Sequence, residues 1–589
     1  MAMHSRNRTI APSSSTAPAA VRRLGGGMAS ALLAGLLAAC SSTPLPPWEQ
    51  GTVVQAGQVH RLPPGQAMPM GVQGEAAAPY SPAVAARFAE PAVRYATPGL
   101  QQGREQFSSN EEIQSFLGQL AARPVAGVAA QPLVIGRSQA GAPIHALLVG
   151  KGVTLDPAGF ARSGKPTVLL IGQQHGNEPA AGEALLVAAE QLLNGQWASA
   201  LNQLNVIIVP RANPDGALAG RRALGNDIDL NRDHLLLRTP EARALAQLVR
   251  DYRPLVIVDS HEFSVMGRVQ QKFQLVQAYD AMLQYANTPN IGDFTIKAAN
   301  EWFVQPMFEE LKRHDLRAQW YFTTSSDMQD QSLSMGGIRP DTGRNVNGLK
   351  NAVSLLIETR GVGIGRHHIQ RRVHTHVVLV RKVLEQAAVR ASHLQQVKSY
   401  VEREAASSAC SGQIVIEAAQ TQEHKEVLLL DPNTGADVVR KLPWKSSLQL
   451  QSTRQRNRPC GYLLAHSEGD AVARLQMLGV NVLRVAEAGD LQVERYQETA
   501  REQGQRQDVL GPMGSEAQIL RVQVQLARER VTVPAGSYYV PMGQPLANLA
   551  IAALEPDTQN SYFANRIQHD LGSLVRVVEP PALVFEEVE

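Results

Sequence analysis

Two short segments of the sequence carry side chains that suit a divalent metal ion. His175 and Glu178 lie three residues apart, just after the apolar segment TVLLIG (167–172). His261 comes two residues after the apolar segment LVIVD (255–259). Imidazole nitrogens and carboxylate oxygens are ligands that zinc favours, and a catalytic zinc site leaves one position open for water. We therefore predict that these three residues hold one Zn²⁺ ion.

The elements that must position these residues follow an alternating pattern. Residues 132–150 are typical of two strands around a glycine-containing turn, and apolar segments typical of buried strands lie at 167–172, 205–209, 255–259 and 353–358. Helical segments lie between and around them, at 109–123, 178–194, 239–252, 297–313 and 366–395. This alternation predicts an α/β fold with a mixed, mostly parallel sheet that helices cover on both faces. Sites in such sheets lie at the carboxyl ends of strands, where the candidate ligands fall.

Six ordered motifs resemble those of the zinc metallocarboxypeptidase family (carboxypeptidase A/B-like, also called funnelins). They are GRSQAGAPIHAL (136–147), HGNE (175–178), NPDG (213–216), an Arg-x₆-DLNR block (222–232), DSH (259–261) and IETRG (357–361). The resemblance covers about residues 109–395. It implies a carboxypeptidase-like fold and zinc-dependent removal of C-terminal residues from peptides.

The resemblance also implies a role for each catalytic residue. His175, Glu178 and His261 correspond to the zinc ligands, and Glu358 corresponds to the general base that activates water. Arg222 corresponds to the arginine that stabilises the oxyanion. These roles agree with the chemistry, because amide hydrolysis needs an activated water, a proton acceptor and a positive charge beside the developing oxyanion.

Three further residues take supporting roles by the same resemblance. Asn231 and Arg232 correspond to the pair that grips the terminal carboxylate of the substrate, which a guanidinium can bind with two parallel hydrogen bonds. Asp229 corresponds to the carboxylate that orients the first zinc histidine. The family also supplies a loop tyrosine before the general base, but no Tyr lies between Phe322 and Glu358. We predict that Arg344, within that stretch, contributes to substrate binding instead.

The amino terminus resembles a bacterial lipoprotein signal peptide. An apolar run over residues 28–39 is too short to span a bilayer and ends in LAA before Cys40. We predict that residues 1–39 are removed and that Cys40 is lipidated. Because Ser follows Cys40, the pattern favours the outer membrane of a Gram-negative cell, facing the periplasm. An ordinary cleaved signal peptide with a chance cysteine is the alternative.

The rest of the chain divides into three further parts. Residues 40–105 are rich in Pro, Gly and Ala and are typical of a tether, residues 106–398 form the predicted catalytic domain, and residues 405–589 form a predicted β-rich C-terminal domain. Cys410 and Cys460 would form a disulfide bond in an oxidising periplasm. By closing a loop in the unfolded chain, this bond would stabilise the fold by about 4 kcal/mol. Two buried free thiols are the alternative.

Composition and missing motifs exclude several classes of function. The chain carries 56 Lys and Arg against 53 Asp and Glu, with 5% aromatic residues. That balance and the scarce aromatics argue against a nucleic-acid partner. No serine-hydrolase elbow, P-loop or dinucleotide fingerprint is present. We interpret the histidines at 367, 368, 374 and 376 as a solvated basic face, because histidines two apart on a helix do not face each other.

Two alternatives to carboxypeptidase activity stay open from the sequence. One is an amidase, deacylase or peptidase that acts on muropeptide amide bonds of the cell wall. The other is a non-catalytic member of the fold that binds peptides. The predicted partners are therefore a peptide or muropeptide substrate and, through the lipid anchor, a membrane.

Overall fold

The computed structural model describes residues 80–588, apart from residues 124, 515 and 516. The predicted signal peptide, the lipidation site Cys40 and the first part of the predicted tether lie outside the described residues. No helix in the described part of the chain is long and apolar enough to cross a membrane.

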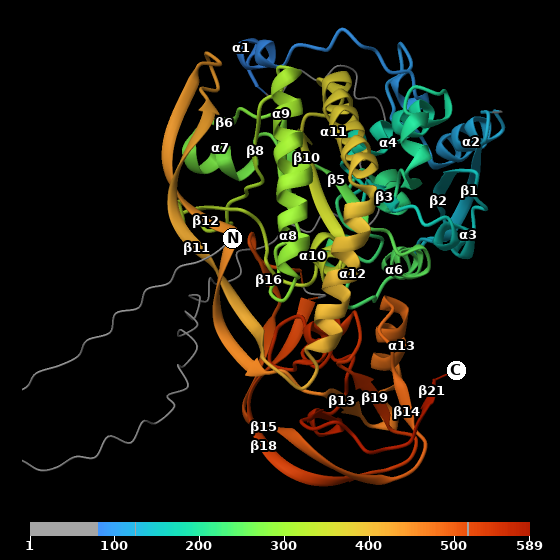
Figure 1. Ribbon diagram of the computed structural model, residues 1–589. Helices are drawn as coiled ribbons and strands as arrows, with labels where there is room; N and C mark the ends of the chain where they lie inside the picture. Colours follow the sequence, from blue (N-terminus) through green and yellow to red (C-terminus); the bar gives the residue numbers. More distant parts are fainter. Residues whose placement is uncertain (1–79, 124, 515–516, 589) are drawn as a thin grey trace, which may run out of the picture. The chain divides into compact units, whose positions relative to one another are not determined.

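An eight-stranded mixed sheet lies at the centre of the amino-terminal half (Figure 1). Its strands, in spatial order, are β1 (Val128–Arg137), β2 (Pro143–Lys151), β4 (Asn205–Val209), β3 (Thr167–Gly172), β5 (Val256–Ser264), β10 (Val353–Val362), β7 (Ala281–Tyr285) and β8 (Ala318–Trp320). The four central strands β4, β3, β5 and β10 are parallel. The pairs β1–β2, β2–β4 and β10–β7 are antiparallel.

Helices cover both faces of this sheet because its central strands are apolar on both sides. Val168 and Leu170 pack into one core, and Leu169 and Ile171 pack into the other. The first core is shared with α2 (Asn110–Ala121), α4 (Pro179–Leu193), α9 (Gln305–Arg313) and α11 (Ile369–Val389). The second is shared with α6 (Pro240–Tyr252) and α10 (Gly343–Leu349). The predicted α/β fold class is confirmed.

Smaller elements connect the strands of the central sheet. They are α3 (Pro157–Arg162), η3 (Ala198–Asn202), α5 (Pro214–Ala219), η4 (Leu230–Arg232), α7 (Gly267–Phe273), α8 (Asp293–Ala298) and the π-helical η5 (Ala299–Val304). Local signals explain where several helices begin. Ser109 and Glu112 form a capping box at the start of α2, and Thr239 caps α6 before Pro240.

The carboxy-terminal half is rich in strands, as predicted. A seven-stranded sheet contains β18 (Gln518–Val533), β15 (Gly489–Gln505), β20 (Leu574–Val577), β13 (Gly461–Leu464), β19 (Tyr538–Pro541), β14 (Leu483–Val485) and β21 (Phe585–Glu587). Helices α13 (Gly469–Leu478) and α14 (Ala547–Leu554) pack in the same core as its residues Tyr462 and Leu464. A short hairpin pairs β16 (Gln507–Asp508) with β17 (Gly511–Pro512).

Strands from both sides of the predicted domain boundary near residue 405 form one sheet. After α12 (Ala391–Ser407), strands β11 (Gln413–Leu430) and β12 (Asp437–Asn457) form a long hairpin. This hairpin pairs with β6 (Val276–Gln277) and β9 (Leu333–Ser334), which belong to the predicted catalytic domain. A disulfide bond joins Cys410, before the hairpin, to Cys460, after it. The boundaries of the four predicted segments stay predictions.

The structure differs from the predicted tether over residues 80–105. This segment contains α1 (Pro82–Ala85) and two 3₁₀ turns, η1 (Ala86–Phe88) and η2 (Pro98–Leu100). Tyr80, Phe88 and Leu100 are buried against the body that follows. The physical reason is that the few large apolar side chains of the segment find partners in the core, which the Pro- and Ala-rich composition did not reveal.

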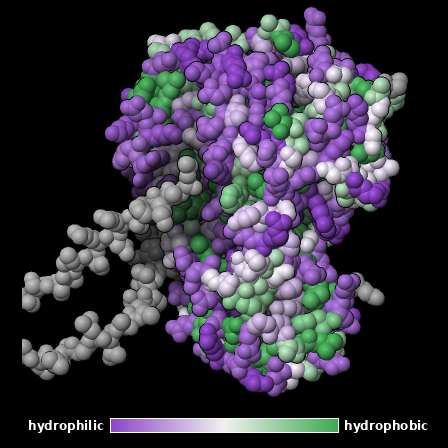
Figure 2. Space-filling view, viewed as in Figure 1, coloured by the Kyte–Doolittle hydropathy of each residue, from purple (hydrophilic) through white to green (hydrophobic). Residues whose placement is uncertain are grey.

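The histidines of α11 do not form a solvated face, so that interpretation was wrong. His376 is completely buried, and its Nε2 lies 3.0 Å from the Thr359 hydroxyl of β10. His374 Nδ1 lies 2.8 Å from the hydroxyl of Tyr95. His376 contacts β10, and His374 contacts the segment that contains Tyr95. The sequence of α11 alone does not show which other parts of the chain pack against it. On the face viewed in Figure 2, the surface over α9 and α11 is mainly hydrophilic, with hydrophobic residues in separate patches.

Acid should destabilise the fold through His374. Burial, with help from His314 and Arg371, lowers the pKa of His374 from 6.5 to about 4. Between these values the unfolded chain binds a proton that the folded chain does not, so the free energy of unfolding falls as the pH drops from 6.5 to 4. Urea unfolding at pH 7 and pH 4.5 measures this difference. The difference in unfolding free energy between the two pH values should be smaller in His374→Gln than in the wild type. The exposed-site control His424→Gln should keep the wild-type difference. If His374→Gln also keeps it, His374 is not the cause of the loss of stability in acid.

Candidate metal centre

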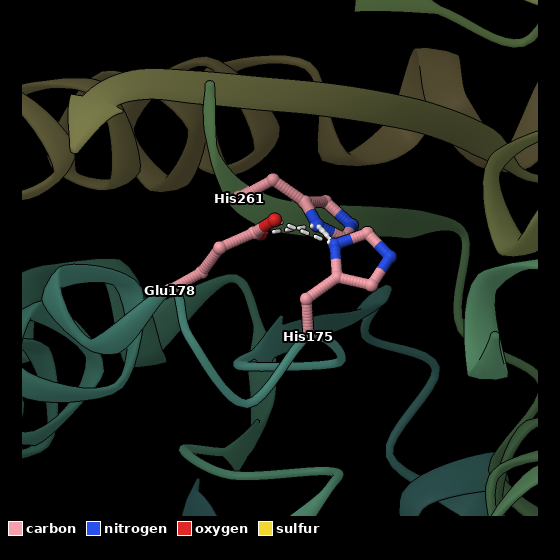
Figure 3. Close-up of side chains that lie close together, drawn as sticks. All are labelled: His175, Glu178 and His261. Carbon is pink, nitrogen blue, oxygen red and sulfur yellow. Dashed lines mark hydrogen bonds and ion pairs between the residues drawn. The ribbon is translucent and has the colours of Figure 1, made fainter. Parts of the chain in front are cut away.

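Three buried side chains converge at the carboxyl ends of β3 and β5 (Figure 3). His175 lies in the loop after β3, Glu178 directly precedes α4, and His261 lies within β5. Glu178 Oε1 lies 2.7 Å from His175 Nδ1, and Glu178 Oε2 lies 2.8 Å from His261 Nδ1. The two Nδ1 atoms are 3.1 Å apart. All of the donor atoms therefore face one small volume.

Close packing of the backbone keeps the loop after β3 in this position. A Cβ atom added to Gly176 would lie only 1.9 Å from the backbone carbon of Gly216 in α5. Position 176 therefore requires glycine. Because glycine has no side chain, the backbone of the HGNE motif can pack directly against the backbone of the NPDG motif. Asn213 strengthens the junction, because its side-chain Nδ2 donates a hydrogen bond to the backbone carbonyl of Gln174 at 3.2 Å.

The far side of each imidazole ring shows that the site fits a metal ion. His175 Nε2 lies 3.1 Å from Asp229 Oδ1, and His261 Nε2 lies 2.8 Å from Asp259 Oδ1. A carboxylate at Nε2 fixes the proton on that nitrogen and leaves the Nδ1 lone pair free for a metal. Both lone pairs then point at Glu178. The donor set of two imidazole nitrogens and one carboxylate is one that zinc favours.

Glu178 is ionised in this setting. Burial opposes its ionisation, but the neighbouring rings of His175 and His261 outweigh burial and lower its pKa. Three converging donors, one of them a buried carboxylate, form a site that a cation would neutralise.

Asp259 contacts the candidate site, and the sequence interpretation missed it. It lies two residues before His261 on β5, so both side chains project from the same face of the strand. Gln174 holds it in place, because its Nε2 donates a 2.6 Å hydrogen bond to Asp259 Oδ1. The DSH motif could have indicated this contact. On a strand, an acidic residue two positions before a metal-binding histidine lies beside that histidine on the same face.

Asp259→Asn should weaken zinc binding about 10- to 100-fold, because the amide is a poorer acceptor for the imidazole N–H of His261. Competition for zinc with a fluorescent chelator measures the affinity. The exposed-site variant Asp251→Asn serves as the matched control. Equal affinities for Asp259→Asn and the control would show that this carboxylate does not support the ligand.

Glu358 faces the same site from the neighbouring strand. It is directly opposite His261 in the parallel register of β10 and β5. Residues paired in this way project from the same face of a sheet. Its side chain is almost buried, and burial raises its pKa to about 8. A carboxyl group with a raised pKa beside a metal site is suited to accept and return a proton.

Arg222 supplies positive charge next to the ligands. Its Nη2 lies 2.9 Å from Asp229 Oδ2, and its Nη1 lies 3.5 Å from Glu178 Oε1. The side chain stays 44% exposed, so it can reach a substrate. Its neighbour Arg221 points elsewhere and pairs with Asp227 at 2.9 Å.

The residues predicted to bind the substrate have different surroundings. Asn231 is buried, and its Nδ2 donates to Asp259 Oδ2 at 3.3 Å. Arg232 pairs with Asp508 of the carboxy-terminal half at 3.1 Å. Arg344 is buried in α10, where its Nη2 donates to the carbonyl of Gly337 at 3.2 Å. Their roles in substrate binding stay predictions.

Tyr321 is a second residue that the sequence interpretation missed. It lies one residue upstream of the stretch in which we looked for a tyrosine. Burial raises the pKa of its hydroxyl, and Glu358 and Arg222 are close enough for their charges to act on it. Tyr321 directly follows the short strand β8 and belongs to none of the six motifs. Its spacing from those motifs therefore gave no signal.

Within the part of the chain that the structure describes, these residues form one buried His-Glu-His site with a nearby carboxyl group and an arginine, an arrangement typical of a metallohydrolase. Comparison with known families is more specific. Residues 126–267 match the model of the zinc carboxypeptidase family, a range that contains the three candidate ligands, Asp229, Asp259 and Arg222. Carboxypeptidase 2 of Trichophyton equinum is 28% identical over 406 residues, which is 68% of this chain and 73% of the relative.

Other relatives and solved structures carry similar names. Carboxypeptidase E of Caenorhabditis elegans is 41% identical over 88 residues, 12% of this chain and 18% of the relative. A solved metallo-carboxypeptidase of Burkholderia cenocepacia is 18% identical with a TM-score of 0.35, covering 48% of this chain and 70% of the other. One of Pseudomonas aeruginosa is 19% identical with a TM-score of 0.35, covering 48% and 69%. Residues 126–267 therefore match the zinc carboxypeptidase family, and the curated relatives that the chain resembles are named carboxypeptidases.

Proposed function

We propose that this protein is a zinc-dependent carboxypeptidase that removes residues from the C-terminus of peptides. The observation that carries this proposal is the shared donor volume of His175, Glu178 and His261, with Glu358 opposite His261 on the adjacent strand. The match to zinc carboxypeptidases and the names of the curated relatives support cleavage of peptides rather than of cell-wall amide bonds.

The side chains divide the reaction between them. His175, Glu178 and His261 would hold a zinc ion, whose Lewis acidity would make water a nucleophile near neutral pH. Glu358 accepts the proton of the attacking water and returns it to the nitrogen of the leaving amine. Arg222 places its positive charge where the substrate's carbonyl oxygen becomes negative. Asp229 and Asp259 hold the two imidazole rings in the orientation that binding requires.

A library experiment tests this proposal. The purified protein is incubated with mixed peptides and with muropeptides, with and without a chelator, and the products are identified by mass. We expect products that lack one C-terminal residue, no products with chelator, and recovery on adding zinc. Internal cleavage, or cleavage of muropeptides alone, would contradict the proposal. C-terminally amidated copies of the same peptides serve as the control.

We also propose that the mature protein is anchored by lipid on Cys40 to the outer membrane and faces the periplasm. The support is the sequence pattern before Cys40, which lies outside the described residues. Fractionation of cells that express the full chain tests it. The wild-type chain should sediment with outer membranes, and Cys40→Ser should not; equal distribution of the two would contradict lipid anchoring.

A further inference from the structure

The guanidinium of Arg232 is already occupied. Its Nη2 lies 3.1 Å from Asp508 Oδ2, and its Nη1 donates to the carbonyl of Asn231 at 2.7 Å. The side chains of the ion pair are only 16% and 14% exposed. Asp229 and Asp341 add further negative charge around Arg232. A substrate carboxylate that approached Arg232 would therefore have to displace a carboxylate of the chain itself.

The contact with Asp508 belongs to a fixed structure. Asp508 lies in the β16–β17 hairpin, residues 507–512, which other bonds hold against the catalytic half. The Arg506 guanidinium donates to the carbonyl of Arg232 at 2.9 Å, and that of Arg339 donates to the carbonyl of Gln507 at 2.9 Å. The backbone N–H of Ser326 donates to the carbonyl of Leu510 at 2.9 Å. These bonds tie the hairpin to three separate loops.

Arg344 has the opposite surroundings. Its side chain is buried, with 4% exposed, and its Nε has no hydrogen-bond partner. Among the described residues it forms no ion pair, and the carboxylates of Asp259 and Glu358 act on it only from a distance. A buried guanidinium without a counter-ion is costly, so an anion that binds there is strongly favoured.

The position of Arg344 is set by its neighbours. Thr342 caps the start of α10, and Asn345 Nδ2 donates to the carbonyl of Arg339 at 2.7 Å. The backbone N–H of its neighbour Gly343 donates to Asn231 Oδ1 at 2.8 Å, and Asn231 Nδ2 lies 3.1 Å from His261 Nε2, so α10 begins beside a metal ligand. The site thus contains one neutralised and one unpaired buried arginine.

We propose that Arg344 binds the terminal carboxylate of the substrate and that Arg232 instead docks the 507–512 hairpin through Asp508. This inference rests on the proposed carboxypeptidase function. The free Nε edge of Arg344 can offer a carboxylate two parallel N–H donors, which is the strong bidentate geometry of this pair. The carboxy-terminal half then forms part of the wall of the site.

Paired substrates test the assignment. The kcat/KM of zinc-loaded enzyme is measured on peptides with a free C-terminal carboxylate and on their amides. Arg344→Gln should lower the value for the free acid about 100-fold, mainly through KM, and so remove most of the preference for the free acid over the amide. Arg232→Gln should lower both values together, because it loosens the hairpin. Loss of the acid-to-amide preference in Arg232→Gln but not in Arg344→Gln would overturn the proposal.

Binding to an inactive variant separates this proposal from the catalytic one. Calorimetry on Glu358→Gln uses N-acetyl-L-phenylalanine and its amide as probes. Adding Arg344→Gln should abolish the preference for the free acid, and Arg344→Lys should restore part of it. The exposed-site control Arg123→Gln should keep the preference. If the wild type cleaves no peptide but this pattern holds, the proposed function fails and the anion site stands. Free-acid binding that survives Arg344→Gln would refute the site.

Discussion

Replacing Glu358 by Gln should lower kcat by about 10²- to 10⁴-fold, because an amide cannot accept the proton of the attacking water. Zinc should stay bound, since the three ligands come from other positions. The measurement is the steady-state rate on a peptide substrate, together with zinc content by mass spectrometry. The substitution keeps size and shape, so a loss of activity at full zinc content isolates the proton transfer.

The control for this variant is Glu301→Gln, an exposed position in η5. It should keep wild-type activity and zinc. A Glu358→Gln enzyme that turns over at the wild-type rate would remove the general base from the mechanism.

Replacing Arg222 by Met should lower kcat by about 10²- to 10³-fold, the usual cost of losing one donor to a developing oxyanion. The effect should appear in kcat more than in KM, because the oxyanion exists only in the transition state. The charge also lies 3.5 Å from Glu178 Oε1, so zinc affinity is measured in the same preparation.

Arg221→Met is the matched control, because the two arginines are adjacent and only Arg222 faces the ligands. We expect Arg221→Met to keep nearly full activity. If both variants lose activity equally, the effect comes from the loop as a whole. If Arg221→Met alone is inactive, the assignment of the two residues is reversed.

The sequence predicted the centre of the fold well because local patterns determine it. The uninterrupted apolar segments at 167–172 and 205–209 correspond to β3 and β4 residue for residue. A strand buried on both faces has few alternatives to such a segment. The predicted metal ligands meet in space for the same reason, since His175 follows β3 and His261 lies near the carboxyl end of the neighbouring parallel strand β5.

Contacts between distant parts of the chain could not be predicted in this way. Arg232 and Asp508 are separated by 276 residues, and nothing in their local sequence indicates that they pair. The burial of His376 depends on elements that cover α11, and the role of Asp259 depends on which face of β5 it shares with His261. The spacing of apolar residues predicts which face of a helix or strand is buried. It does not predict which other part of the chain packs against that face.

Anomalous X-ray scattering at the zinc edge, on crystals of the zinc-loaded protein, tests the central claim most directly. The account predicts one peak, about 2.0–2.2 Å from His175 Nδ1, His261 Nδ1 and the Glu178 carboxylate. A peak bound to other residues, or zinc-loaded crystals with no ion between these three side chains, would contradict it.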